Sequence, residues 1–198
     1  MTDKQQLDAI LQKWDLLTHP FYKAWSAGTL PNEAFQLYAS EYGRFIEMMP
    51  QGWETLDDLE TADEEREHAE MWRDFSAALE APAAAGLIPQ TEELVRTAEV
   101  LFSQRPSALG ALYAFEAQQP ATAQSKLEGL RTHYRYPKTV EPYFEVHSSN
   151  WHESQKILAR IQELSPAEQV EARLACEWMA QALWDALTGI QQAAGCES

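Results

Sequence analysis

Cysteine and basic residues are scarce in this chain of 198 residues. Its two cysteines, Cys176 and Cys196, provide neither a disulfide framework nor a Cys-x-x-Cys metal motif, and we expect a reducing, cytoplasmic compartment. Fifteen lysines and arginines stand against 31 aspartates and glutamates, a formal net charge of −16. This charge argues against binding to nucleic acid, or to an anionic membrane, through a general electrostatic footprint.

Long apolar runs are also missing. No stretch reaches the roughly 18 consecutive apolar residues that a membrane span needs, and the polar start MTDKQQLDAILQ lacks the apolar core of a signal peptide. We therefore expect neither membrane insertion nor export. What is present, 45% hydrophobic and 11% aromatic residues, is sufficient for a packed core.

No segment alternates between apolar and polar residues as a half-buried strand does. Apolar residues instead recur at helical spacing, and prolines separate the segments. The expected helices cover residues 7–17, 21–26, 31–49, 53–79 (one helix or a pair), 90–103, 107–119, 121–133, 141–163 and 166–192. The prediction is an all-α fold in one domain over 1–198, a bundle of about seven or eight helices.

One carboxylate stands alone in an apolar helix. Glu116 is the only charged residue between Arg105 and Lys126, within the segment SALGALYAFEAQQ. An ionised carboxylate in an apolar interior costs several kcal/mol, by rough estimate, unless it is paired, hydrogen-bonded, metal-bound or protonated. A partner arginine, tyrosine or tryptophan in the core would explain it, and so would a functional site.

Two histidines could meet Glu116. His68 follows Glu64 by four residues and Glu65 by three, so that a carboxylate and an imidazole can project from one helix face. His147 lies in PYFEVHSSNWHES, on a later helix. Taken singly, each is explained by a solvated or a core histidine. Together, two imidazoles and a carboxylate from three helices are sufficient to bind non-haem iron(II) with open positions.

Three segments resemble the heme-oxygenase-like superfamily, which contains TenA, PqqC and the CADD-type para-aminobenzoate synthases. They are HPFYKAWSAGTLPNEAFQLYASEYGRF, LGALYAFEAQQPATAQSKLEGLRTHY and PYFEVH, and the similarity covers nearly the whole chain. The middle segment resembles the CADD-type synthases and the heme-oxygenase-like di-iron oxidases more than TenA, because Gly110 stands where TenA has its catalytic cysteine. The resemblance implies a heme-oxygenase-like bundle, an oxidoreductase rather than a thiaminase, and a homodimer.

For the metal, the resemblance implies six ligands: a Glu and a His seven residues apart, a Glu on the next inward helix, and His-x-x-x-Asp-x-x-x-His later. His68, Glu116 and His147 match three of these positions. The early glutamate position holds Thr61, and the candidates near it are Glu60 and Glu64.

The last two ligand positions hold Trp151 and Gln155. Tryptophan cannot ligate iron through its indole N–H, so we expect one iron ion per chain or none. If His147 faces the interior, Trp151 one turn later should face it too. His152 and Glu153 are one residue out of register and should point about 100° away.

The resemblance also implies two catalytic residues. In the CADD-type synthases a tyrosine of the protein itself is thought to be consumed as the precursor of the aminobenzoate ring, and a lysine is required as well. Tyr22 and Lys126 occupy the corresponding positions. The structural alternatives are a core tyrosine with a hydrogen-bonded hydroxyl and a solvated lysine.

Three functions stay open. The first is an oxidoreductase that uses iron, held by the three matching ligands, and O2 to act on a small molecule. The second is a metal-free enzyme or binding protein that resembles PqqC or TenA, with acid or base chemistry by Glu116 and His147. The third is a helical module that recruits a protein partner. The small-molecule pocket expected of the second would be lined by Trp25, Tyr38, Tyr42, Tyr113 and Trp151.

Overall fold

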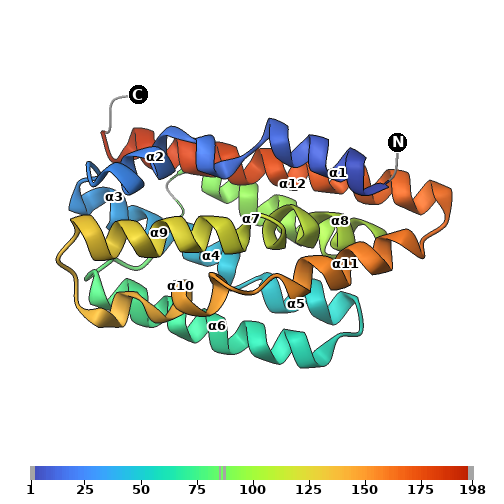
Figure 1. Cartoon of the computed structure of the whole chain (residues 1–198), viewed down its shortest axis with the longest axis horizontal. Coiled ribbons are helices and arrows are strands. Elements are labelled where there is room, and N and C mark those ends of the chain that lie inside the picture. The colour runs from blue at the N-terminus through green and yellow to red at the C-terminus, as the bar shows by residue number, and fades with distance from the viewer. Residues whose placement is uncertain (1–2, 85, 87, 196–198) are drawn as a thin grey trace.

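The computed structural model describes residues 3–84, 86 and 88–195 (Figure 1). Over these ranges the chain forms helices and no strand, which confirms the predicted all-α fold, and none of these helices is long and apolar enough to cross a membrane. The elements are α1 (Asp3–Lys13), η1 (Leu16–Thr18), α2 (Pro20–Ala27), α3 (Asn32–Leu37), η2 (Tyr38–Tyr42), α4 (Gly43–Ile46), α5 (Met49–Thr55), α6 (Leu59–Ala78), α7 (Pro89–Leu101), α8 (Arg105–Glu116), α9 (Gln119–His133), η3 (Lys138–Val140), α10 (Pro142–His147), α11 (His152–Gln162) and α12 (Pro166–Ala193).

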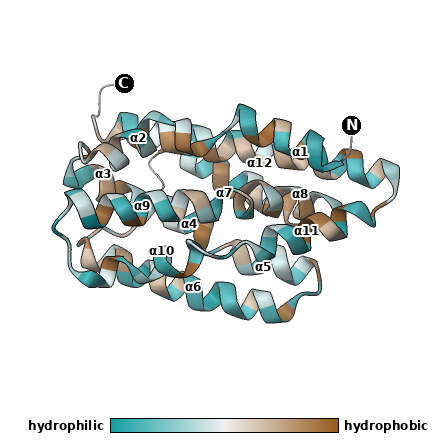
Figure 2. Cartoon of the chain, viewed as in Figure 1, coloured by the Kyte–Doolittle hydropathy of each residue, from teal (hydrophilic) through white to brown (hydrophobic). Residues whose placement is uncertain are grey.

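Helix α8 runs through the middle of the bundle. Every residue from Ser107 to Glu116 is buried, and α5, α7, α9, α11 and α12 contact it. Figure 2 shows α8 coloured mainly toward the hydrophobic end of the scale and α6, along the lower edge, mainly hydrophilic. A Cβ added at Gly110 would lie 1.8 Å from the carbonyl oxygen of Ala172 on α12. Gly110 is therefore needed for the close approach of these two backbones.

Prolines mark where most of the helices begin. A proline occupies the first or second position of α2, α5, α7, α8, α9, α10 and α12, where the missing backbone N–H has no helical partner to lose. Pro50, expected to end the helix over 31–49, lies in the first turn of α5 instead. The helical stretch before it contains a π-helical turn, Tyr38–Tyr42, between α3 and α4.

The helix expected over 141–163 is interrupted. Helix α10 ends at His147, and α11 begins only at His152. In the turn between them, the backbone N–H of Trp151 donates to the carbonyl oxygen of Ser149. Serine and asparagine side chains compete with helical hydrogen bonds and favour such turns, and residues 148–150 read Ser-Ser-Asn. The interruption changes the direction in which every later side chain of this segment points.

Candidate metal centre

Two histidines and three glutamates converge in the interior, supplied by four helices. Glu65 and His68 come from α6, Glu116 from the end of α8, His147 from the end of α10 and Glu153 from the first turn of α11. All five are buried. The ligand atoms of Glu65, His68 and His147 lie within 4.8 Å of one another, and so do those of Glu65, Glu116 and Glu153. Glu65 is therefore common to both triads.

His147 offers a lone pair to this site. Its Nδ1 lies 2.6 Å from the carbonyl oxygen of Tyr143, which can only accept, so Nδ1 carries the proton and Nε2 keeps its lone pair. Within the described chain, the buried Nε2 has no hydrogen-bond partner. Burial and the neighbouring His68 and Lys126 lower the pKa of His147 to about 3. The ring is thus neutral at physiological pH, the form in which histidine binds metals.

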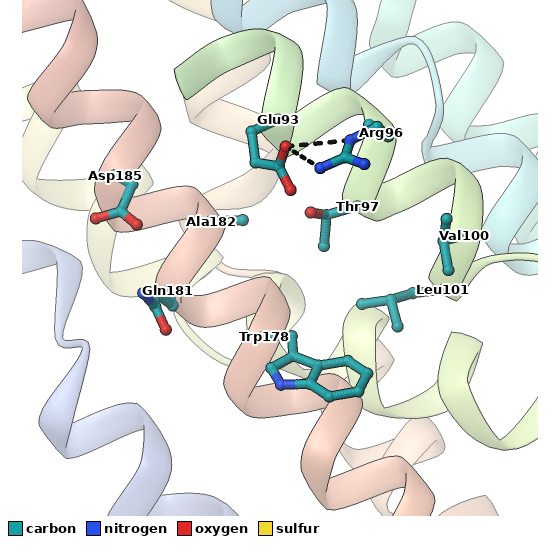
Figure 3. A pocket seen from close by; sticks show the side chains of 9 residues that line it. All are labelled: Glu93, Arg96, Thr97, Val100, Leu101, Trp178, Gln181, Ala182 and Asp185. Carbon is teal, nitrogen blue, oxygen red and sulfur yellow. Dashed lines mark hydrogen bonds and ion pairs between the residues drawn. The ribbon is translucent and has the colours of Figure 1, made fainter. Parts of the chain in front are cut away.

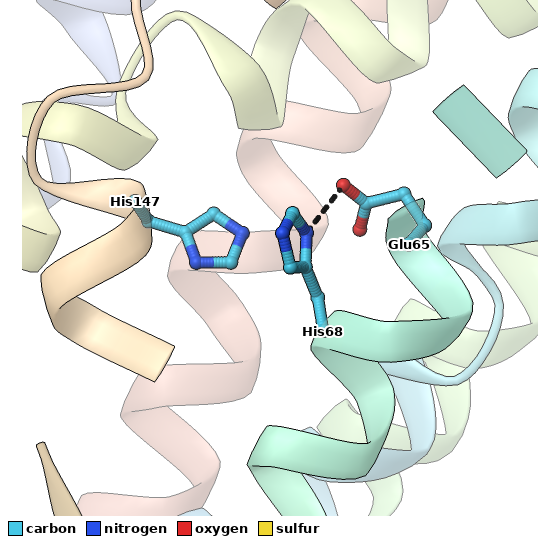
Figure 4. Close-up of side chains that lie close together, drawn as sticks. All are labelled: Glu65, His68 and His147. Atoms are coloured by element: carbon cyan, nitrogen blue, oxygen red, sulfur yellow. Dashed lines mark hydrogen bonds and ion pairs between the residues drawn. The ribbon is translucent and has the colours of Figure 1, made fainter. Parts of the chain in front are cut away.

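His68 lies between His147 and Glu65 (Figure 4). Its Nδ1 is 3.0 Å from Oε1 of Glu65, and its ring centroid is 4.4 Å from that of His147. Burial lowers the pKa of His68, but the hydrogen bond to Glu65 and the negative charge there outweigh it, so the pKa is raised overall. A carboxylate that receives one ring N–H and fixes the imidazole is the usual support of a metal-binding histidine.

The three glutamates form an unusually crowded acidic group. Burial and the charges of Glu153 and Glu65 raise the pKa of Glu116 well above its ordinary value, and burial also raises that of Glu65. Oε1 of Glu116 and both carboxylate oxygens of Glu153 have no donor in hydrogen-bond geometry, although the side chains of Glu153 and Trp53 lie beside Glu116, and among the described residues no lysine or arginine pairs with any of the three glutamates. Each buried acceptor left in this way costs about 1–3 kcal/mol. A cation held by the three glutamates would satisfy these oxygens, and a cation held by Glu65, His68 and His147 would satisfy Nε2 of His147, so the residues fit metal binding.

The structure places His68 and His147 in one group with Glu65, and Glu116 in a second group that shares Glu65 with the first. The other two metal candidates, Glu60 and Glu64, are exposed. Glu65, which was not among the predicted ligands, is the buried carboxylate, and its Glu-x-x-His spacing to His68 is the sequence signal that could have identified it.

Thr61 occupies the position of the first glutamate in the six-ligand pattern, and a lysine side chain contacts it. Lys156 donates from Nζ to the Thr61 hydroxyl at 2.8 Å and pairs with Asp58 at 2.6 Å. The structure therefore departs here from the six-ligand pattern, since an ammonium group cannot bind a metal ion.

The prediction that Trp151 faces the interior is wrong. Trp151 is 49% exposed, whereas Glu153 is 1% exposed, and Gln155 is exposed as well. The count of about 100° per residue applies only along an unbroken helix, and the turn after His147 resets it. Glu153 reaches the site where Trp151 was expected. The argument from Trp151 for at most one metal ion consequently no longer holds.

A second buried polar cluster joins α2, the π-helical turn and α9. Lys126 donates from Nζ to the hydroxyls of Tyr22 and Tyr38, at 3.2 and 3.1 Å, and these hydroxyls are 3.0 Å apart. All three side chains are buried, so Lys126 is not a solvated lysine. Burial lowers the pKa of Lys126 to about 7 and raises the pKa of both tyrosines well above the ordinary value.

Tyr143 and Phe144 of α10 connect this cluster to the glutamates and histidines. The Tyr143 ring lies 4.2 Å from that of His147, and the Lys126 Nζ lies 5.4 Å from the centre of the Phe144 ring. Burial is the main cause of the raised pKa of Tyr143, and the charges of Glu65, Glu116 and Tyr22 add to it. The two clusters are therefore neighbours in one interior.

The aromatic residues expected to line a pocket are dispersed. Tyr38 and Tyr42 stack on each other with ring centroids 4.9 Å apart, and Tyr38 lies 5.4 Å from Trp25. Tyr113 lies instead near Asp8 of α1 and Cys176 of α12. Burial, with smaller contributions from these two residues, raises the pKa of its hydroxyl to about 12. Trp151 is exposed and cannot share an interior lining with them.

A surface groove of about 340 Å³ lies between α7 and α12 (Figure 3). Trp178 of α12 projects beside it, and Glu93 and Arg96, one turn apart on α7, pair with each other on the other side. None of the five buried residues of the candidate metal centre lines this groove. The groove is separate from the candidate metal centre.

Comparison with known proteins agrees with this architecture. A family model described as iron-containing redox enzyme matches residues 53–185, which include all five residues of the candidate metal centre. The chain is 32% identical to a 4-aminobenzoate synthase of Nitrosomonas europaea, over 96% of this chain and 92% of that protein. It is 27% identical to a 4-aminobenzoate synthase of Chlamydia muridarum, over 96% and 91%.

Among solved structures, a TenA homologue from Pseudomonas syringae pv. tomato superposes with a TM-score of 0.74 at 15% identity, covering 96% of this chain and 93% of that one. A CADD-like protein of unknown function from Nostoc punctiforme superposes with a TM-score of 0.66 at 19% identity, covering 97% and 96%. At such low identity the structures show the fold, whereas the family model spans most of the chain. The chain therefore belongs to the heme-oxygenase-like family of iron-containing redox enzymes.

Proposed function

We propose that this protein is an iron-dependent oxidase of the 4-aminobenzoate synthase type. One observation carries the proposal: four buried ligand atoms, on Glu116, His147 and Glu153, have no hydrogen-bond partner in the described chain. A protein interior normally satisfies such atoms, and a functional ligand is the usual explanation where it does not. The residues that would hold the iron are Glu65, His68, Glu116, His147 and Glu153.

Bound iron(II) with open positions supplies the activation of O2 and, with it, oxidising equivalents. Because the two triads share Glu65, we expect at least one iron ion per chain. The surrounding residues orient the ligands and limit the access of water. Glu65 orients His68, the Tyr143 carbonyl fixes the tautomer of His147, and the apolar walls of α8 limit the access of water.

Lys126 and Tyr22 form the second part of the proposal. Because burial raises the pKa of Tyr22, its hydroxyl keeps its proton, and oxidation of the phenol requires a base nearby. Lys126 lies 3.2 Å away, and its pKa of about 7 leaves a large share of neutral amine at physiological pH. Lys126 can accept that proton. The relatives named 4-aminobenzoate synthase and the resemblance in the sequence support Tyr22 as the source of the product ring.

The metal is tested first. Protein purified without chelator and without a nickel column should contain iron by elemental analysis, at one equivalent per chain or more. Glu153→Gln should lower that content, because it removes a ligand oxygen without changing shape. Less than about a tenth of an equivalent after anaerobic incubation with iron(II) would contradict the metal centre.

The product is tested by isotope labelling. Protein grown with ring-labelled tyrosine, then given iron(II), a reductant and O2, should release labelled 4-aminobenzoate, measured by mass spectrometry. Tyr22→Phe should abolish this release. The matched control is Tyr136→Phe, since the Tyr136 hydroxyl bonds Asn32 outside both clusters. Release of labelled product from Tyr22→Phe would show that another tyrosine is the source.

The metal-free alternative loses its main support. Trp151 was one of the residues expected to line its pocket and the reason to expect at most one iron ion, and its side chain is on the surface. No specific observation in the described chain favours the third function, a module that recruits a protein partner.

A further inference from the structure

A third group of ligand atoms lies at the outer edge of the metal centre. It consists of Glu64 on α6 with His152 and Glu153 at the start of α11, whose ligand atoms lie within 4.8 Å of one another. Glu64 and His152 are exposed, whereas Glu153 is buried. The group therefore reaches from the surface to the interior.

Glu153 belongs to this group and to the inner triad with Glu65 and Glu116. Neither of its carboxylate oxygens has a hydrogen-bond partner in the described chain, although the side chain is only 1% exposed. Its carboxylate can therefore contact a cation held by Glu64 and His152 or a cation held by Glu65 and Glu116. A metal ion held by Glu64 and His152 would be separated from the buried ligands by this one side chain.

The cations on the same two helices are already engaged. Arg66 pairs with Glu54 and Asp63, and Lys156 pairs with Asp58. No ion pair to a described lysine or arginine neutralises Glu64 or Glu153. Two carboxylates and an imidazole are a donor set that suits divalent first-row transition metals.

We propose that Glu64 and His152 form a receiving site for divalent transition metal ions, from which Glu153 passes the ion to the buried ligands. This inference rests on the proposed function, because it requires a resident metal inside. Glu64 and His152 are needed for the rate of loading and are not resident ligands. Removing them should slow metal uptake and leave the final metal content unchanged.

The test uses cobalt(II), whose visible absorption reports on its ligands, mixed with chelator-treated full-length protein in a stopped-flow instrument. The uptake rate is measured for the unmodified protein, Glu64→Gln, His152→Gln and the double variant. The controls are Glu67→Gln, an equal charge change at another exposed position of α6, and His133→Gln, at an exposed histidine of α9. We expect Glu64→Gln to load about tenfold more slowly, the low end of what local charge contributes to association rates. His152→Gln, which removes a ligand nitrogen without removing negative charge, should load more slowly than His133→Gln, and every variant should reach the same end point.

Each outcome is informative. Test variants that load as fast as the controls, while the unmodified protein fills normally, would overturn the receiving site and leave the metal centre intact. A lowered final cobalt content in Glu64→Gln or His152→Gln would also overturn it, because these residues would then be resident ligands. No uptake by the unmodified protein would refute the proposed function and this inference with it.

Discussion

Replacing Lys126 by methionine should stabilise the protein near neutral pH and much less at high pH. The Lys126 side chain is buried, and burial lowers the pKa of its amine from 10.5 to about 7. The difference corresponds to about 5 kcal/mol of unfavourable free energy when the amine is charged in the folded state. Below pH 7 this cost is present in full. As the pH rises from 7 toward 10.5, the unfolded state binds more protons than the folded state, so stability rises and the cost disappears.

The expected magnitude follows from these two pKa values. Ionisation of Lys126 should cost about 4 kcal/mol at pH 7 and about 2 kcal/mol at pH 9. Lys126→Met also loses two hydrogen bonds to tyrosine hydroxyls, about 1 kcal/mol each. The variant should therefore be more stable than the unmodified protein by about 2 kcal/mol at pH 7, and about equally stable at pH 9.

Urea denaturation followed by tryptophan fluorescence at pH 7, 8 and 9 measures this difference. Chelator-treated protein is used, so that metal binding does not vary with pH. Lys23→Met is the control, because Lys23 is exposed on the helix that carries Tyr22 and keeps its hydration on folding. A stability difference between Lys126→Met and the unmodified protein that does not change with pH would refute the reasoning. So would a difference that grows as the pH rises.

Three further predictions concern the candidate metal centre, the packing of α8 against α12 and the position of Trp151. Glu116→Met should raise the urea midpoint of chelator-treated protein by relieving about 1–3 kcal/mol of unsatisfied burial, and should lower the iron content; unchanged iron would contradict a ligand role. Gly110→Ala should lower the free energy of unfolding by about 2 kcal/mol or more, because its Cβ would meet the Ala172 carbonyl at 1.8 Å, and a neutral result in urea would contradict that contact. Trp151→Ala should change stability by no more than about 0.5 kcal/mol and leave the iron content intact, whereas large losses would place its ring inside.

The fold class and the central helix can be predicted from local features of the sequence. Helical spacing and the positions of the prolines are local properties, and the all-α bundle follows from them. The isolation of Glu116 in an apolar segment predicted that it would be buried, and the structure confirms its burial. The Glu-x-x-His spacing of Glu65 and His68 is local as well, because three residues separate neighbours on one helix face.

Which later carboxylate completes the site depends on tertiary packing and could not be predicted from helical spacing. Helical spacing relates side-chain directions only within an unbroken helix, and the turn after His147 exchanges Trp151 for Glu153. The burial of Lys126 likewise depends on α2 and the π-helical turn packing over α9, far away in the sequence. A lysine on a polar helix is expected to be solvated until such partners enclose it, and it is this enclosure that shifts its pKa and gives it a chemical role.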